Sequence, residues 1–141
     1  MSKPILCLDF DGVIHSYASG WRGAEIIPDP PVPGAIQWLL TACDHFTVHI
    51  YSSRSSQPGG IEAMKAWLRH WARDAHAVLH PDETKHGLAA DLALMRHLHW
   101  PTEKPAAFVT IDDRALTFNG NWSDPAWAPE RLLAFKPWNK S

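Results

Sequence analysis

The sequence predicts one α/β domain of 141 residues built on a parallel sheet. Short apolar runs typical of buried strands alternate with longer segments in which apolar residues recur at helical spacing. Alternating segments of these lengths favour a parallel sheet with right-handed crossovers. No repeat, low-complexity tract or linker interrupts the pattern, so we expect residues 1–141 to form a single domain.

The first half of the chain supplies two strands and two helices. Proline suits the first turn of a helix, so Pro33 and Gly34 mark a helix start, with Ile36, Leu39, Leu40 and Cys43 on its inner face. A loop rich in glycine and proline precedes that helix. The expected order is a strand at 5–8, the loop at 14–33, this helix, a strand at 46–51, a loop at 55–60 and a helix carrying Ile61, Met64, Leu68, Trp71 and Ala75.

The second half of the chain continues the alternation. Apolar side chains at Leu88, Leu92 and Met95 predict the inner face of a helix. The expected order is a short strand at 77–79, this helix at 86–98, a strand at 107–111 and an edge strand at 132–135 that ends before Pro137.

Composition limits where the protein works and what it binds. The net charge of −2 gives no general attraction to nucleic acid or to an anionic membrane, so nucleic acid is expected only as a substrate. The first apolar run is broken by Asp9, which fits neither a signal peptide nor a membrane span. Cys7 and Cys43 fall in predicted core positions, as expected of free thiols in a reducing cytoplasm. The sequence sets no oligomeric state.

The most informative segment is the end of the first strand, where Asp9, Asp11 and Gly12 follow an apolar run. Ligands of open α/β sheets bind outside the carboxyl ends of the strands. Two carboxylates at such a place need a counter-charge, which indicates a divalent cation. A calcium loop of the EF-hand type would need glutamate where Gly20 stands, so that interpretation is rejected.

Two further expected strands also end in polar side chains. Ser52 and Ser53 follow the strand at 46–51, and Asp112 and Asp113 follow the strand at 107–111. The two aspartates are suited to binding a metal, to capping a following helix, or to both. Each group is followed directly by an arginine, Arg54 and Arg114 respectively.

In order and spacing, these strand ends resemble motifs I, II and IV of the haloacid dehalogenase (HAD) superfamily, and the resemblance spans residues 5–114. It implies a three-layer Rossmann-like parallel sheet in which the strand at 5–8 lies between those at 46–51 and 107–111. It also implies a minimal cap or none, with residues 14–33 as a small flap. The third motif is a lysine, for which Lys104 is preferred because it precedes Pro105 and the last strand; Lys85 is the rival.

The resemblance implies a Mg²⁺-dependent phosphatase that acts through an aspartyl-phosphate. Asp9 is the expected nucleophile, and Asp11 the general acid and base. Ser52, with Ser53 beside it, is expected to bind the phosphoryl group. Lys104 is expected to stabilise charge on Asp9 and on the phosphoryl oxygens.

The expected metal is Mg²⁺, which prefers oxygen ligands. Its implied ligands are the Asp9 carboxylate, the main-chain carbonyl of Asp11 and Asp112, with Asp113 as a further ligand or as an orienting group. Zinc is not expected, because the nine histidines form no Cys/His ligand set.

An uncapped site admits phosphomonoesters that are small or macromolecular, and the sequence does not identify which. Arg54 and Arg114 are candidates for substrate contact or for ion pairs with site carboxylates. Trp21 and Arg22 are candidates for binding a ring of the substrate or for anchoring the flap. The alternatives are a phosphotransferase, a phosphatase acting on nucleic-acid ends, and a catalytically silent module that binds phosphate or metal.

Overall fold

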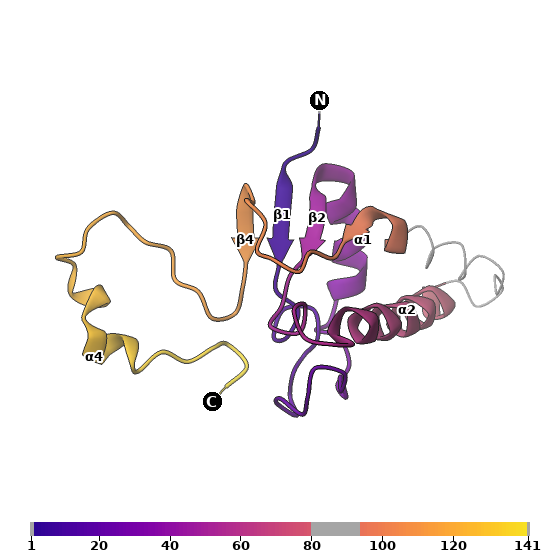
Figure 1. The fold of residues 1–141 in the computed structure, drawn as a ribbon, viewed down its shortest axis with the longest axis horizontal. Coiled ribbons are helices and arrows are strands. Elements are labelled where there is room, and N and C mark those ends of the chain that lie inside the picture. Colours follow the sequence, from indigo (N-terminus) through magenta and orange to yellow (C-terminus); the bar gives the residue numbers. More distant parts are fainter. Residues whose placement is uncertain (1, 80–93, 141) are drawn as a thin grey trace.

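A computed structural model describes residues 2–79 and 94–140 and has α/β architecture around a four-stranded, fully parallel sheet (Figure 1). The strand order is β3-β2-β1-β4, so β1 is central and pairs with both β2 and β4, as predicted. The strands are β1 (Ile5–Leu8), β2 (Thr47–Ile50), β3 (Leu98–His99) and β4 (Val109–Ile111).

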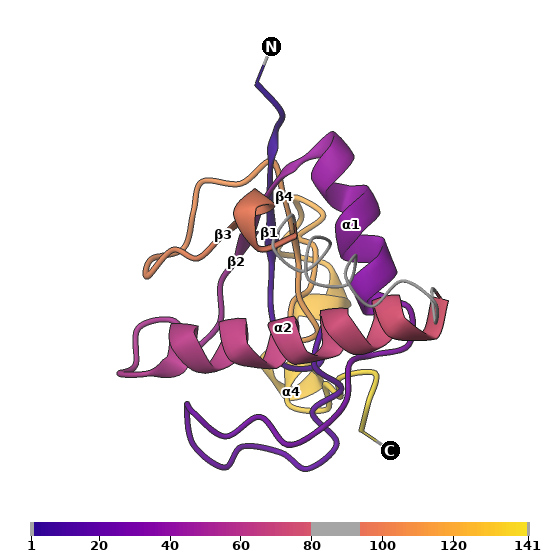
Figure 2. The ribbon, with the colours of Figure 1, turned by 90° about the vertical axis from the view of Figure 1, so that its right-hand side faces the viewer.

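Two helices build the core with one face of the sheet. Helix α1 (Ala35–His45) begins after Gly34, whose φ of 85° is readily adopted only by glycine. Helix α2 (Gly60–Leu79) follows β2. Figure 2 shows α1 along one side of the strands and α2 running across the strand direction.

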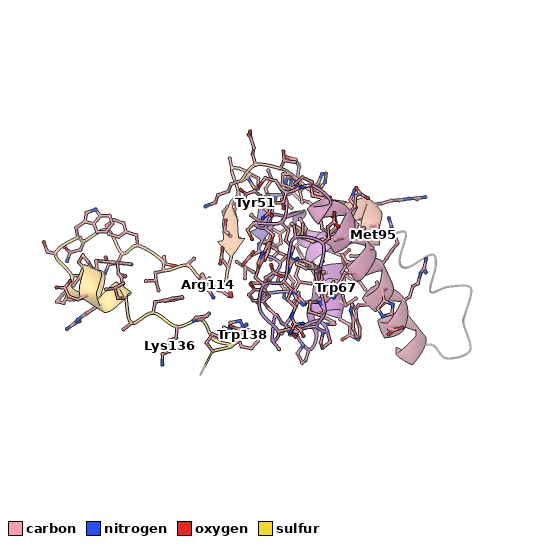
Figure 3. All side chains as sticks on the ribbon, turned by 60° about the horizontal axis from the view of Figure 1, so that its bottom comes forward. Tyr51, Trp67, Met95, Arg114, Lys136 and Trp138 are labelled. Atoms are coloured by element: carbon pink, nitrogen blue, oxygen red, sulfur yellow. The ribbon has the colours of Figure 1, made fainter. Side chains whose placement is uncertain are left out.

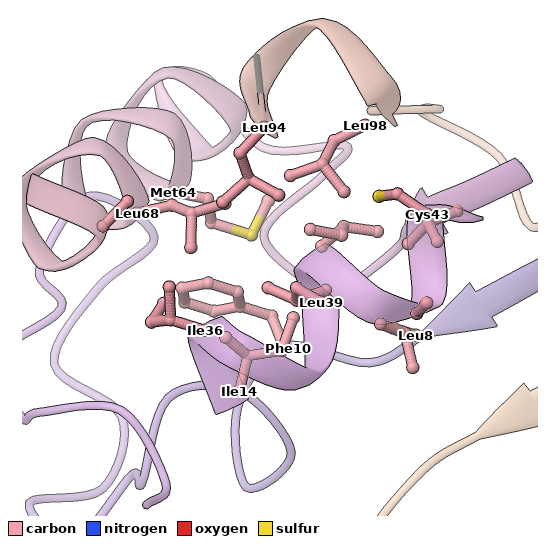
Figure 4. Close-up of a cluster of buried hydrophobic side chains, with 14 of the residues drawn as sticks. Leu8, Phe10, Ile14, Ile36, Leu39, Cys43, Met64, Leu68, Leu94 and Leu98 are labelled. Atoms are coloured by element: carbon pink, nitrogen blue, oxygen red, sulfur yellow. The ribbon is translucent and has the colours of Figure 1, made fainter. Parts of the chain in front are cut away.

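The core forms where α1 and α2 meet this face of the sheet. Side chains alternate along a strand, so Leu6 and Leu8 of β1 share a face with Val48 and Ile50 of β2. These side chains pack against Leu39 of α1 and against Met64 and Leu68 of α2, among others (Figure 4). The buried cluster fixes α1 and α2 relative to the strands, and so fixes the position of the strand ends.

The opposite face of the sheet carries Cys7, His49 and Thr110 in register. In Figure 2 this side is bordered by the connection that leads from β3 to β4. Helices on this face, which a third layer requires, are not seen in the part of the chain that the structure describes. Cys7 and Cys43 are both buried and free.

Two predicted strands are wrong. Residues 77–79 are the last residues of α2, and β3 lies at Leu98–His99 instead. A short apolar run fits a strand and a buried helix turn equally well, and here the helix simply continues. Of the helix expected at 86–98, residues 86–93 lie outside the described residues, residues 94–97 are helical, and Leu98 belongs to β3.

The expected edge strand at 132–135 is also replaced by helix. The short helix α4 (Pro129–Leu132) begins with a proline and carries Glu130 in its first turn, which are both favourable there. Strand β4 is therefore an edge of the described sheet.

Residues 115–137 form a long excursion that leaves the sheet after β4 and returns near its carboxyl end (Figure 1). A 3-10 helix, η1 (Pro125–Trp127), precedes α4. Phe118 stacks on Trp122 with ring centroids 4.3 Å apart, and Trp122 is 76% exposed. The excursion is thus ordered by its own local contacts and presents aromatic rings to solvent. None of the described helices has the length and apolarity that a membrane crossing requires.

The core packing of α1 predicts unequal effects for two adjacent leucines. Leu39 is fully buried, whereas Leu40, which the sequence placed on the inner face, is 44% exposed. We expect Leu39→Ala to lower the free energy of unfolding by about 2–5 kcal/mol, because a cavity replaces packed methyl groups. The matched change Leu40→Ala is expected to cost less than about 1 kcal/mol. Urea denaturation of both variants measures the difference; equal losses would contradict the packing described for α1.

Candidate functional site

Three carboxylates meet at the carboxyl ends of β1 and β4. The parallel register pairs Leu8 with Ile111, and the Asp9 amide donates to the Ile111 carbonyl at 3.0 Å, so Asp9 leaves β1 beside the aspartates that follow β4. One carboxylate oxygen from each of Asp9, Asp112 and Asp113 lies within 4.8 Å of the others. In the described part of the chain, this is the one group of three potential ligands close enough to share a metal ion.

The electrostatics of this group favour a bound cation. The pKa of Asp9 is raised to about 8, first by burial and then by a hydrogen bond with Asp113 and the charge of Asp112; the Phe10 amide, 2.8 Å away, opposes the rise. A divalent ion would remove this penalty, because an opposite charge favours the ionised carboxylate. Three carboxylates form a donor set that suits Mg²⁺ or Ca²⁺.

Gly12 permits the close approach of the two strand ends. Its φ is 79°, and a Cβ atom at this position would collide with the Asp113 carboxylate. Glycine is therefore required here both by its conformation and by the space that Asp113 occupies.

A cavity of about 120 Å³ opens onto the carboxylates. It is lined by Asp9, Asp11, Tyr17, Ser53, Asp113 and Arg114. Its size suits a small polar group, since drug-sized ligands occupy pockets of roughly 300–1,000 Å³. A larger, apolar cavity of about 420 Å³ lies between α1 and the β1–β4 edge, but it contains none of these carboxylates. We therefore assign the chemistry to the smaller cavity.

The Asp11 carboxylate turns toward two buried partners. Nε of Arg54 donates to both its oxygens, at 3.0 and 3.2 Å, and Nδ1 of His15 lies 2.9 Å from Oδ1. Nε2 of His15 accepts the Asp29 amide at 3.1 Å, so Nδ1 carries the hydrogen and donates to Asp11. Together these hydrogen bonds fix the orientation of the Asp11 carboxylate. Arg54 and His15 are each 0% exposed, so both of these partners of Asp11 are shielded from water.

Arg54 also holds the flap to the site. Its Nη1 donates to the carbonyls of Gly23, Ala24 and Ile26 at 2.8, 2.9 and 3.2 Å. Its guanidinium lies 4.7 Å from the ring centre of Trp21, a cation–π contact. Of the two roles considered for Arg54, substrate contact or an ion pair, the structure has the ion pair with Asp11. Of the two roles considered for Trp21, its contact with Arg54 is consistent with anchoring the flap.

Asp29 is the second anchor of the flap. Burial alone would raise its pKa, but hydrogen bonds from the Ser19 hydroxyl and amide, at 2.6 and 2.7 Å, hold the pKa of Asp29 below its ordinary value. The nearby charge of Arg22 acts in the same direction. The indole of Trp67 donates to the Asp29 carbonyl at 2.9 Å and ties the flap to α2.

The two serines after β2 occupy different positions. Ser52 is 4% exposed, and its hydroxyl accepts the Arg54 amide at 3.2 Å. Its own amide donates to the Ser55 hydroxyl at 3.0 Å. Ser53 lines the cavity, whereas Ser52 does not. Ser52 shapes the turn, and Ser53 is the serine of this pair that borders the cavity.

Lys104 is exposed on the connection between β3 and β4, and no ion pair of its ammonium is found within residues 2–79 and 94–140. Burial raises the pKa of the Cys7 thiol, Lys104 opposes that rise, and Asp9 and Asp112 add to it. The charges of Lys104, Asp9 and Asp112 thus all act on this one thiol. Lys85 lies outside the described residues.

Three residues near the site were not singled out from the sequence. His15 stands four residues after Asp11, a spacing that could have suggested the contact. Tyr17 lines the cavity with a positive φ of 61°, which is unusual for a residue other than glycine. The indole of Trp138 donates to the Gly12 carbonyl at 2.7 Å, across 126 residues, and no local pattern announces such a contact.

Figure 3 labels Arg114, where the C-terminal excursion leaves the body of the molecule, and Trp138, where the excursion rejoins it. The Arg114 amide donates to Oδ1 of Asp112 at 2.8 Å, which orders the turn after β4.

Comparisons of the chain with protein-family models, with curated proteins and with solved structures found no match.

The raised pKa of Asp9 makes stability depend on pH and on metal. An ordinary unfolded aspartate has a pKa of about 3.9, so the folded state binds the extra proton, and its stability falls as pH rises toward 8. We expect the melting temperature in EDTA to fall between pH 6 and pH 8. We expect Mg²⁺ to raise it more at pH 8 than at pH 6. Thermal unfolding of the wild type and Asp9→Asn measures both effects; a variant with the same pH and Mg²⁺ dependence as wild type would contradict this account.

Proposed function

We propose that the protein is a Mg²⁺-dependent phosphoryl hydrolase of the HAD-like type that acts on a phosphomonoester. The observation that carries the proposal is the meeting of Asp9, Asp112 and Asp113 at the ends of adjacent parallel strands, with Asp11 and Ser53 on the same cavity. Phosphoryl transfer needs a nucleophile in line with the leaving group, neutralisation of charge and control of protons. This cavity offers a residue for each requirement.

In the proposed first step, an oxygen of Asp9 attacks phosphorus. An aspartyl-phosphate bond forms, the bond from phosphorus to the ester oxygen breaks, and that oxygen takes a proton from Asp11. Splitting hydrolysis into two displacements lowers each barrier, which is the advantage of a covalent intermediate. Because Asp11 supplies this proton, the first step is expected to depend on Asp11 more strongly for a substrate with a poor leaving group than for one with a good leaving group.

In the proposed second step, water attacks the phosphorus of the aspartyl-phosphate. Asp11, now ionised, takes the proton from water, the bond to Asp9 breaks and inorganic phosphate leaves. The hydrogen bonds from Arg54 and His15 suit this step, because they fix the orientation of the Asp11 carboxylate. Proton transfer by a positioned group typically contributes about 10²–10⁴ in rate.

The carboxylates of Asp9, Asp112 and Asp113, with the main-chain carbonyl of Asp11, would hold the Mg²⁺. When bound, the ion would neutralise charge on the phosphoryl oxygens. Ser53 would donate a hydrogen bond to the phosphoryl group, and Ser52 would support it from the turn below. Arg114 also lines the cavity and is the positively charged residue among its lining residues, so it would contact the substrate.

A nucleic-acid end is the second candidate substrate, and one observation favours it. The excursion after β4 presents stacked Phe118 and Trp122 to solvent, a surface on which nucleobases commonly stack. A comparison of 3′- and 5′-phosphorylated oligonucleotides with a simple aryl phosphate tests this candidate. A preference for oligonucleotides that Trp122→Ala removes would support it, and equal turnover of all substrates would reject it.

The nucleophile is tested by Asp9→Asn. We expect loss of hydrolysis of an aryl phosphate by a factor on the order of 10³ or more, because the attacking carboxylate is gone. Asp44→Asn, at an exposed carboxylate near the end of α1, is the matched control and should retain full activity. Activity of Asp9→Asn within tenfold of wild type would remove Asp9 from the role.

The lysine assignment is tested by Lys104→Ala. Loss of a positive charge that stabilises the transition state typically costs about 10²–10³ in rate. Lys136→Ala, which removes an exposed lysine from the excursion, is expected to leave turnover unchanged. Steady-state kinetics on one substrate compares the two. Full activity of Lys104→Ala would transfer the role to another cation.

A further inference from the structure

The chain returns to its first motif at its C-terminal end. After the excursion at 115–137, the Trp138 indole donates to the Gly12 carbonyl at 2.7 Å. The next residue, Asn139, donates through Nδ2 to the Ser16 carbonyl at 3.2 Å. Two consecutive side chains thus bind the two ends of the turn that follows Asp11.

The turn contains the peptide groups on which the metal site depends. The Gly12 amide donates to the His15 carbonyl at 2.8 Å, and because a peptide group is planar, this bond also orients the Asp11 carbonyl. The next peptide group, which begins with the Gly12 carbonyl, receives the Trp138 hydrogen bond. Gly12 also lies against the Asp113 carboxylate. A shift of the Gly12 carbonyl is therefore expected to move both the Asp11 carbonyl, on the β1 side of the site, and the contact with Asp113, on the β4 side.

Burial of Trp138 does not account for its position. The side chain is 64% exposed, so little apolar surface is removed from water. Most of the excursion lies away from the sheet (Figure 1). The directed hydrogen bond is thus the specific feature of this contact, and its acceptor belongs to the turn that carries Asp11.

We infer that Trp138 is a positioning residue for the metal site: its indole N–H fixes the Gly12 carbonyl and holds the 11–16 turn against Asp113. The inference rests on the proposed function, in that the turn is positioned for Mg²⁺ and for Asp11. It makes the C-terminal segment part of the site, although no residue after Arg114 belongs to the motifs found in the sequence.

The test is Trp138→Phe in the full chain, which keeps an aromatic ring and removes the N–H donor. Trp122→Phe is the matched control, because Trp122 is also an exposed tryptophan on the excursion. Hydrogen exchange of the 10–17 segment, measured by mass spectrometry, reports on the turn. Titration with Mg²⁺ alone, followed by thermal unfolding or calorimetry, reports on the metal site without substrate.

We expect Trp138→Phe to speed exchange in the 10–17 segment and to weaken Mg²⁺ binding roughly three- to tenfold, the effect of one neutral hydrogen bond. Trp122→Phe should change neither. Unchanged exchange would overturn the inference, and so would faster exchange with unchanged Mg²⁺ affinity, since Trp138 would then only anchor the C-terminus. A wild-type protein that binds no Mg²⁺ would instead refute the proposed function, while the exchange rates would still decide whether Trp138 holds the turn.

Discussion

The mutual repulsion of Asp9, Asp112 and Asp113 is the constraint around which the site is built. Parallel pairing of β1 with β4 brings these carboxylates together, and the pKa of Asp9 is raised first by burial and then by its Asp113 and Asp112 neighbours. Such clustered charge persists in proteins mainly where a cation or a proton offsets it. The apolar core between the sheet and helices α1 and α2 stabilises the sheet. This stabilisation holds the strand ends in place against the unfavourable electrostatic energy of the carboxylates. The three carboxylates therefore suit a positively charged partner.

A second charge arrangement separates the two aspartates of the first motif. Asp9 faces other carboxylates, whereas Asp11 faces Arg54 and His15, so two side chains two residues apart experience opposite fields. Different environments for paired carboxylates are what acid–base and nucleophilic roles require. The same Arg54 binds three carbonyls of the flap. The flap and the Asp11 carboxylate are therefore connected through one buried guanidinium.

Much of the sheet was predictable, because buried strands and their polar ends leave a local signal. The central position of β1 and the approach of Asp9 to Asp112 followed from that signal together with the family resemblance. The strands predicted at 77–79 and 132–135 failed because short apolar runs do not distinguish strand from helix. The Trp138 contact had no local signal at all, since it depends on how the chain closes over 126 residues.

The central claim is that Asp9 accepts a phosphoryl group beside a metal ion held by the neighbouring aspartates. A crystal structure of the protein with Mg²⁺ and beryllofluoride, which mimics a phosphoryl group on a carboxylate, tests it most directly. The account predicts the beryllium bonded to an Asp9 oxygen, and Mg²⁺ in contact with Asp9 and with Asp112 or Asp113. Beryllofluoride bound elsewhere, or Mg²⁺ absent from these carboxylates at saturating concentration, would contradict it.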